Sequence, residues 1–235
     1  PAITVRFKVI SEPKTFADAS TADGKTFFLA WTTTPWTLPS NLGLCMGPEI
    51  DYVKILDKPT GDFYILAESR LHAYYKDEND YEVVYKKKGA DFAGVKYEPL
   101  FPYFKHLAVM DDGSAGAFRI FNGDFVSTED GTGIVHTAPG FGEDDSKLFQ
   151  GTGIPFAEPI DAECRFTHEV SDYEGRFVKD CDKDIMSRLK AEGKLVKRDT
   201  IVHSYPHCWR CASPLIYRSI GSWFVKVSEE RDVLL

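Results

Sequence analysis

The sequence lacks any apolar run that approaches the roughly 18 residues needed to cross a membrane, so we expect no membrane partner. It also lacks an excess of positive charge, because 36 acidic residues against 28 basic ones give a net charge of −8. A protein held to nucleic acid mainly by phosphate neutralisation is basic. Any nucleic acid partner of this chain would therefore bind through a local patch, with affinity supplied elsewhere in a larger protein.

The sequence starts without a Met and without a basic-then-apolar leader, so we expect that this segment is not a secretory signal peptide. Residues 1–7 resemble the middle of a strand, and residues 228–235 have a helical pattern that stops at the last residue. We therefore expect this chain to be a piece of a longer polypeptide.

The cysteines are few and their number is odd. Together with the missing leader, this predicts a reducing, cytoplasmic setting. The five cysteines are Cys45, Cys164, Cys181, Cys208 and Cys211. Cys208 and Cys211 form a Cys-x-x-Cys pair, which is half of a four-ligand zinc site, but the sequence has no second pair. His203 and His207 are the only nearby candidates to complete a site, and His207 adjoins Cys208 in an awkward geometry. We therefore expect no metal and no cofactor.

The sequence also lacks the regular alternation of strands and helices that builds a parallel α/β sheet. Alternating or β-branched runs predict strands over 3–10, 27–34, 52–56, 63–67, 81–85, 117–126 and 133–138. Helical patterns cover only 68–75, 144–150 and 182–192, the last with Gly193 as its stop. This balance predicts an α+β fold with a β-barrel-like, sheet-rich core and a few peripheral helices.

The composition changes near Ile201, where aromatic residues and cysteines gather. Two strand-like runs across 214–227 join around Gly221. We therefore predict one domain over 1–200 and a β-ribbon or hinge segment over 201–235.

The first unusual motif is WTTTPWTLPSN, residues 31–41. In an extended segment Thr32 and Thr34 share a face while Thr33 points the other way. Pro35 ends this regularity and biases Thr34 towards extended backbone. The hydroxyls offer uncharged donors and acceptors, and the loop can bring Asn41 back near them. The alternative is simple β-propensity, since threonines are common in strands.

The second motif is GTGIVHTAPGFGEDD, residues 131–145. Its glycines allow close approach of backbone to a ligand, and a Gly-Pro-Gly turn brings His136 towards the carboxylates at a helix start. Such acids often only complement the helix dipole, and a lone strand histidine is often a core residue. A carboxylate here can also bind an ammonium group. Together the two motifs indicate a small polar pocket that measures the size of a short ligand.

Both motifs closely resemble the signature motifs of the editing domain of isoleucyl-tRNA synthetase, a class I synthetase. The related valyl and leucyl enzymes have Arg where this chain has Thr34, before Pro35, which favours the isoleucyl branch. The segment SYPHCWRC, residues 204–211, fits the same family. The resemblance implies the editing-domain fold shared by these enzymes, inserted into a catalytic domain, and we expect a monomer.

The activity implied by the resemblance is an aminoacyl-tRNA deacylase that removes valine from valyl-tRNA(Ile), with the 3′ end of tRNA(Ile) as partner. Valine lacks one methylene of isoleucine, which is worth only about 1–3 kcal/mol, a magnitude for which the isoleucyl family is itself the standard example. A second, smaller site would then exclude the correct product. The family's ATP-binding signatures of the HIGH and KMSKS type are absent, so this chain should not activate isoleucine.

The resemblance also implies a role for each motif residue. Asp145 anchors the α-ammonium and His136 gates the size of the side chain. The remaining residues are pocket-lining threonines that place water or substrate (Thr32, Thr33 and Thr34) and supports for the terminal adenosine and the pocket (Trp31 and Asn41). We expect direct attack by water, with a ribose hydroxyl of the substrate as one source of assistance. Phe141 stands where many relatives have His, which argues against a catalytic role there.

Two other functions remain open. One is a non-catalytic module that positions the tRNA acceptor end, for which the basic clusters 86–88 and 194–198 are candidate contacts, although such clusters are usually solvated faces. The other is an unrelated esterase, which would need a nucleophile triad that the sequence does not show.

Overall fold

The structure, a computed structural model, describes residues 1–11, 25–201 and 205–234. The strands are β1 (Ala2–Ser11), β2 (Thr26–Thr32), β3 (Gly43–Met46), β4 (Asp51–Asp57), β5 (Phe63–Ala67), β6 (Tyr81–Lys88), β7 (Lys96–Tyr97), β8 (Arg119–Asn122), β9 (Ile134–Thr137) and β10 (Leu195–Asp199). The α-helices are α1 (Leu71–Tyr74), α2 (Glu143–Phe149), α3 (Asp182–Ala191) and α4 (Val227–Leu234). Short 3-10 turns include Pro35–Ser40, Glu68–Arg70, Glu78–Asp80, Gly89–Phe92, Lys105–Ala108, His168–Tyr173 and Val178–Cys181.

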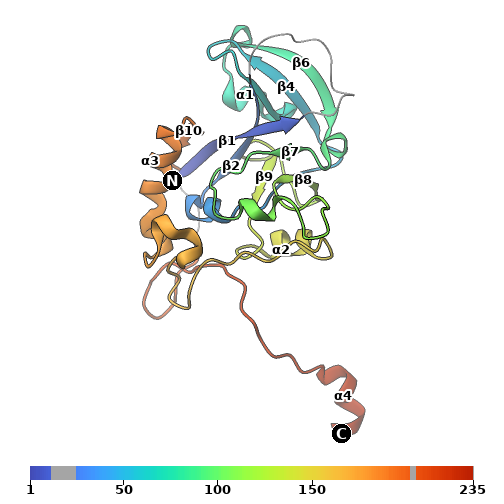
Figure 1. The fold of residues 1–235 in the computed structure, drawn as a ribbon, viewed down its shortest axis with the longest axis vertical. Coiled ribbons are helices and arrows are strands. Elements are labelled where there is room, and N and C mark those ends of the chain that lie inside the picture. The colour runs from blue at the N-terminus through green and yellow to red at the C-terminus, as the bar shows by residue number, and fades with distance from the viewer. Residues whose placement is uncertain (12–24, 202–204, 235) are drawn as a thin grey trace.

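The strands form one sheet in the order β10-β1-β7-β8-β3-β9-β2-β5-β4-β6 (Figure 1). β1 also pairs with β2, in antiparallel register from Ile3 opposite Thr32 to Lys8 opposite Phe27. This extra pairing closes the run β1-β7-β8-β3-β9-β2 into a ring. Closure leaves β5, β4 and β6 as an extension beside β2. The predicted β-barrel-like core with few helices is confirmed.

β2 lies between two hydrophobic clusters because its side chains alternate between opposite faces. Phe28 and Ala30 pack in the main core, whereas Phe27 and Leu29 pack in a second cluster with residues of β4, β5 and α1. All four side chains are buried. The strand is therefore anchored on both faces, which fixes the position of Thr32 at its end.

All the strands predicted from alternation are present, as β1, β2, β4, β5, β6, β8 and β9. The run predicted over 117–126 is shorter, since β8 spans only Arg119–Asn122. The sequence did not indicate β3, β7 or β10. β3 has only four residues and no β-branched side chain, β7 has only two residues, and β10 is a charged strand at the edge of the sheet.

The three predicted helices are confirmed, with 68–75 divided between the turn Glu68–Arg70 and α1. α3 ends as the sequence predicts. The Gly193 amide donates to the Lys190 carbonyl at 3.1 Å, and the Lys194 amide donates to the Leu189 carbonyl at 2.7 Å. Gly193 has φ +66°, the left-handed conformation that this helix cap requires.

The strand-like runs predicted over 214–227 are wrong. The structure has an isolated bridge between His207 and Pro214, but no strand over residues 215–226. Apolar side chains there are exposed, and Trp223 is fully so. Residues of high β-propensity form strands when neighbouring strands pair with them, and the described part of the chain supplies no such neighbour here.

α4 confirms the helical pattern predicted near the last residues, and Figure 1 shows it at the end of an extended segment away from the sheet. Within the described ranges, no helix combines the length and apolar character needed to span a membrane. The division of the chain at residue 200 stays a prediction.

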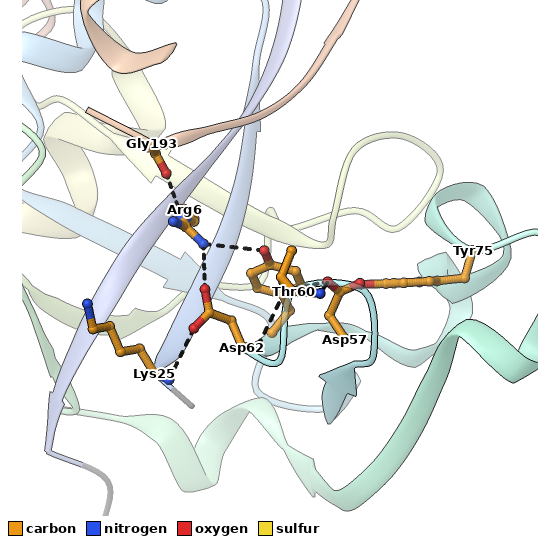
Figure 2. A network of polar contacts seen from close by, with 8 residues as sticks. Arg6, Lys25, Asp57, Thr60, Asp62, Tyr75 and Gly193 are labelled. Atoms are coloured by element: carbon orange, nitrogen blue, oxygen red, sulfur yellow. Dashed lines mark hydrogen bonds and ion pairs between the residues drawn. The ribbon is translucent and has the colours of Figure 1, made fainter. Parts of the chain in front are cut away.

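A polar network joins the extension to the barrel (Figure 2). Arg6 of β1 pairs with Asp62 in the β4–β5 turn at 2.8 Å and donates to the Gly193 carbonyl after α3 at 2.6 Å. In the same turn Asp57 accepts a hydrogen bond of 2.9 Å from Tyr75. Because partly exposed ion pairs contribute little stability, the network mainly sets the position of the turn.

Candidate active site

The two motifs lie side by side because β2 and β9 are parallel neighbours, with Trp31 opposite Val135. The carboxyl ends of both strands therefore meet at the same edge. A cavity of about 270 Å³ opens there, lined by Trp31, Thr32, Thr33, Thr34, Thr37, Val135, His136, Ala138, Phe141 and Asp145. Every residue predicted for the site contributes to this lining except Asn41.

The segment after β2 turns sharply because Pro35 opens a 3-10 turn at the position where its missing amide costs least. The next amide, that of Trp36, donates to Asp182 of α3 at 2.9 Å, which satisfies a group that helix starts leave unpaired. Burial raises the pKa of this Asp182 carboxyl to about 6. The Trp36 ring packs edge to face on Phe141 of the second motif with ring centres 4.9 Å apart. The turn is thus held to both α3 and the second motif.

The threonine hydroxyls form a connected row. Thr32 Oγ1 accepts from the Thr34 amide at 3.1 Å and lies 3.2 Å from Thr34 Oγ1, which confirms that these two side chains share a face. Thr33, predicted to point the other way, also contributes to the lining. The row presents several uncharged donors and acceptors to one small volume.

Gly131 is needed where the second motif passes the first. Its φ is +65°, and a side-chain Cβ at this position would lie 3.0 Å from the Cβ of Trp31. Only glycine adopts this backbone conformation without strain and leaves this space free. The neighbour of Gly131 is thus the Trp31 side chain, and the close approach of a ligand to the glycines of the second motif stays a prediction.

His136 is buried in the wall between the motifs, with 8% of its surface exposed. Its Nε2 lies 3.0 Å from Thr37 Oγ1, and its Nδ1 lies 2.9 Å from Asn41 Nδ2. Burial lowers the pKa of the imidazole to about 4. The ring is therefore neutral near pH 7, and it contributes shape and hydrogen bonds without positive charge.

Asn41 lies behind His136 and touches the cavity only through it. The Asn41 side chain is buried, and its amide donates to the Gly43 carbonyl at 2.7 Å as well as to His136. It supports the pocket wall, as the resemblance implies. Its contact with a terminal adenosine stays a prediction.

Thr37 is a site residue that the sequence reasoning missed. Its hydroxyl donates to the Thr34 carbonyl at 2.9 Å and contacts His136. A signal was present, because a 3-10 turn repeats every three residues and returns Thr37 to the side of Thr34. The sequence reasoning did not recognise the 3-10 turn and therefore did not place Thr37 near Thr34.

Asp145 lies in the first turn of α2 at the far side of the cavity. Its Oδ2 accepts a hydrogen bond of 2.8 Å from the Ala138 amide, while Oδ1 has no partner among residues 1–11, 25–201 and 205–234. Burial raises the pKa of this carboxyl to about 6, against the lowering effect of the Ala138 amide. Gly142 leaves room for it, since a Cβ there would lie 3.0 Å from Asp145 Cγ.

The neighbouring acids differ from Asp145. Glu143 and Asp144 are exposed, and Glu143 pairs with Lys147 at 2.7 Å one turn along α2. These two fit the alternative interpretation, in which acids complement the start of a helix. Asp145 alone turns into the cavity.

The cysteine close to the cavity, Cys45, is not suited to act as a nucleophile. In the part of the chain that the structure describes, no three His, Cys, Asp or Glu side chains gather as a metal site would require, and His203 lies outside that part. Close to the cavity, burial and the charges of Asp145 and Asp124 raise the pKa of the Cys45 thiol to about 12. That thiol stays protonated and is a poor nucleophile.

The site thus combines a row of hydroxyls, a neutral imidazole and one half-buried carboxylate that has an oxygen without a hydrogen bond among the described residues. Such a set suits a small ligand that carries a positive charge at one end. The lining residues include no cysteine, and no lining hydroxyl has an adjacent carboxylate and imidazole arranged as a nucleophile triad requires.

No family model matches the chain. In contrast, the isoleucine–tRNA ligase of Treponema denticola is 58% identical across an alignment that covers 100% of this chain. The chain spans only 23% of the length of that relative.

Solved structures show the same fold at low sequence identity. The structure named GlLeuRS-CP1 matches 87% of this chain with a TM-score of 0.61 and 14% identity, over 100% of its own length. The editing domain of the cytosolic leucyl-tRNA synthetase of P. knowlesi matches 83% with a TM-score of 0.56 and 12% identity, over 95% of its own length. With the sequence relation to the ligase, these matches show that the chain is homologous along its whole length to part of the isoleucine–tRNA ligases and has the fold of a tRNA synthetase editing domain.

Proposed function

We propose that this chain hydrolyses the ester bond between valine and tRNA(Ile), so that it acts as an aminoacyl-tRNA deacylase within an isoleucine–tRNA ligase. The observation that carries the proposal is that Asp145 lines the small cavity while its Oδ1 has no hydrogen bond among the described residues. The proposed partners are the 3′ end of tRNA(Ile) and the catalytic domain of the ligase.

Asp145 is suited to bind the α-ammonium of an esterified amino acid. The Ala138 amide fixes one carboxylate oxygen, and the other has no hydrogen bond among the described residues, so it can accept one from a ligand. Burial makes the unpaired carboxylate unfavourable, as its raised pKa indicates, so an incoming cation removes an existing penalty. An ammonium beside Asp145 should in turn lower the pKa of that carboxyl.

The cavity is suited to discriminate by size. Its volume is about 270 Å³, and His136 forms part of its wall with both ring nitrogens hydrogen-bonded. A ring held at two points cannot move aside for an additional methylene without losing a buried hydrogen bond. The wall therefore favours the smaller valyl group over the isoleucyl group.

Hydrolysis is proposed to occur by direct attack of water on the ester carbonyl. Thr32, Thr33 and Thr34 offer hydroxyls that can hold the water or the ester oxygen near the ammonium site. His136 is not suited to act as the base, because burial lowers its pKa to about 4 and both of its nitrogens are occupied. A ribose hydroxyl of the substrate is the remaining source of assistance.

The structure weakens the basis for a purely tRNA-positioning module. In one basic cluster Lys86 and Lys88 pair with Asp51, and Lys86 also pairs with Glu68. In the other, Lys194 pairs with Glu192 and Lys197 with Asp199. Acidic neighbours thus offset most of the charge that would attract phosphates.

A complex with a non-hydrolysable valyl-adenosine analogue tests the proposal. We expect the ammonium of the analogue within hydrogen-bonding distance of Asp145 Oδ1 and its isopropyl group against His136. The Asp145→Asn variant should lose this complex, whereas Asp144→Asn, on the exposed face of the same turn, should keep it. Binding only at the Lys86 or Lys194 cluster would contradict the proposal and favour the positioning module.

A further inference from the structure

A chain of hydrogen bonds continues behind the cavity wall to a residue far from both motifs. The hydroxyl of Tyr97, on β7, donates to Asn41 Oδ1 at 2.7 Å. Tyr97 is fully buried, and burial raises the pKa of its hydroxyl well above the ordinary range. It therefore remains protonated and acts as a constant donor.

The orientation of the Asn41 amide follows from its other contacts. The Gly43 carbonyl can only accept a hydrogen bond, so the atom 2.7 Å away must be the amide nitrogen of Asn41. The amide oxygen then faces Tyr97, and the nitrogen faces Nδ1 of His136 at 2.9 Å. A flipped amide would place its oxygen against the Gly43 carbonyl.

This orientation determines the tautomer of His136. Because the Asn41 nitrogen donates to Nδ1, that ring nitrogen must be bare, and the neutral ring carries its proton on Nε2. Nε2 then donates to Thr37 Oγ1 at 3.0 Å, and the Thr37 hydroxyl donates onward to the Thr34 carbonyl at 2.9 Å. The bonds all run in one direction, from Tyr97 to the threonine segment.

We propose that Tyr97 is a positioning residue of the site: by holding Asn41, it fixes His136 in the Nε2–H tautomer and sets the direction of the Thr37 hydroxyl. In the other tautomer Nδ1–H would face the Asn41 N–H, and the Thr37 hydroxyl would have to turn from the Thr34 backbone towards Nε2. The wall facing the ligand would then present a different pattern of donors and acceptors. The effect on hydrolysis rests on the function proposed above, whereas the tautomer itself does not.

The Tyr97→Phe variant removes the only hydrogen-bond donor to Asn41 Oδ1 among the described residues, while keeping the ring that packs on Phe7 and Phe118. Asn41 would be left with a buried oxygen that has no partner, so it should lose its fixed orientation. His136 would then lose its constant donor at Nδ1, and both tautomers should become populated.

Nitrogen-15 NMR of the imidazole rings in the 235-residue chain tests this directly, because protonated and bare ring nitrogens have distinct shifts. The His136 signals can be assigned with a His136→Gln variant, since the chain has six histidines. At neutral pH the native chain should show His136 with a proton on Nε2 only. Tyr97→Phe should show averaged or doubled signals.

Tyr52→Phe is a matched control. Tyr52 is also fully buried, and its hydroxyl also donates to a neighbour, the Gly133 carbonyl at 2.6 Å. A general loss of packing or of a buried hydrogen bond would affect both variants alike. The proposal requires that Tyr52→Phe keep the single Nε2–H tautomer.

Two results would overturn the proposal: a native His136 protonated on Nδ1, which does not depend on any variant folding, or a Tyr97→Phe chain that keeps the single tautomer. Deacylation supplies a second readout, in which Tyr97→Phe should slow hydrolysis of valyl-tRNA(Ile) by about two- to tenfold more than Tyr52→Phe does. If the native chain hydrolyses no valyl ester, the proposed function fails while the tautomer result still decides the role of Tyr97.

Discussion

His136 and Asp145 belong to one motif and line one cavity, yet burial affects them in opposite ways. It lowers the pKa of His136 to about 4 and raises the pKa of Asp145 to about 6. The physical cause is the same, because a poorly hydrated site disfavours the charged form of either group. The hydrogen bonds differ, since both nitrogens of His136 have partners whereas Asp145 keeps one oxygen free.

This difference separates a structural wall from a binding group. His136 is complete without a ligand, so its neutral ring is a fixed surface whose position depends on Asn41 and Thr37. Asp145 has an oxygen without a hydrogen bond among the described residues, and under the proposed function this oxygen binds a cation. Discrimination by size should therefore depend on His136, and affinity for the ammonium on Asp145.

The largest expected effect is that of Asp145→Ala on hydrolysis of valyl-tRNA(Ile). Loss of a buried partner for an ammonium costs about 2–5 kcal/mol, which corresponds to roughly 30- to several-thousand-fold in kcat/KM. Asp144→Ala removes an equal charge from the exposed face of the same turn and should change the rate little. Single-turnover deacylation measures both variants. Equal rates for the two variants would remove the distinction between these neighbouring acids.

The second effect is on selectivity and comes from His136→Ala. Removing the ring enlarges the cavity, and we expect new hydrolysis of isoleucyl-tRNA(Ile), with loss of about 10- to 200-fold discrimination. The ratio of the two deacylation rates is the measurement, and circular dichroism controls for folding because the variant removes the contacts of Asn41 and Thr37 with the imidazole ring. An unchanged ratio would show that another residue limits the size of the ligand.

The third effect concerns pH, because the contributions of Asp145 and His136 to the free energy of unfolding depend on pH in opposite directions. The folded-state pKa of Asp145 is above its ordinary value of 3.8, so its contribution to the free energy of unfolding is present below about pH 4 and is lost as pH rises through about 6. For His136, whose pKa is below 6.5, the contribution is present above that value and is lost as pH falls towards 4.

Urea unfolding of Asp145→Asn against the native chain isolates the acid. The variant cannot ionise, so it should be more stable by up to about 3 kcal/mol at pH 7.5, and the difference should shrink towards pH 4. Hydrolysis has the opposite trend, since only ionised Asp145 pairs with an ammonium, and kcat/KM of the native chain should fall about tenfold per pH unit below 6. A stability difference that does not vary with pH would contradict the raised pKa of Asp145.

The smallest effect is expected for Thr37→Val, which keeps the shape of the side chain but removes the acceptor for His136 Nε2. A buried donor without a partner costs about 1–3 kcal/mol, measured as a loss in the free energy of unfolding. Ser187→Ala in α3 is the control, because its exposed hydroxyl donates to the Lys183 carbonyl and lies away from the cavity. Equal losses for both variants would argue against a specific contact between Thr37 and His136.

Much of the fold could be predicted because local patterns and tertiary structure agree along most of the chain. The apolar run in β2 follows from its two buried faces, and Gly193 marks the end of α3 through its backbone conformation. β3 and β10 could not be predicted, because β3 has only four residues and no β-branched side chain, and β10 is charged. The aromatic residues near Trp223 suggested a strand, although nothing in the described part of the chain pairs with them.

The site also contains residues that could be predicted from the sequence and residues that could not. Its motif residues were predicted because glycines, threonines and a carboxylate are unusual in that spacing, and β2 and β9 bring most of them together. The position of Asn41 behind the wall, and the contact of Tyr97 with it, depend on strand pairing across the barrel. No local pattern around Tyr97 distinguishes it from an ordinary core tyrosine.

The central claim is that the cavity hydrolyses a valyl ester and spares an isoleucyl ester. The most direct test is the deacylation rate of valyl-tRNA(Ile) and of isoleucyl-tRNA(Ile) by the native chain, measured with enzyme in excess, alongside a full-length isoleucine–tRNA ligase that contains the same residues. The proposed function predicts faster hydrolysis of the valyl ester by about tenfold or more in both proteins. Equal hydrolysis of both esters, or hydrolysis of neither by the full-length ligase, would contradict it.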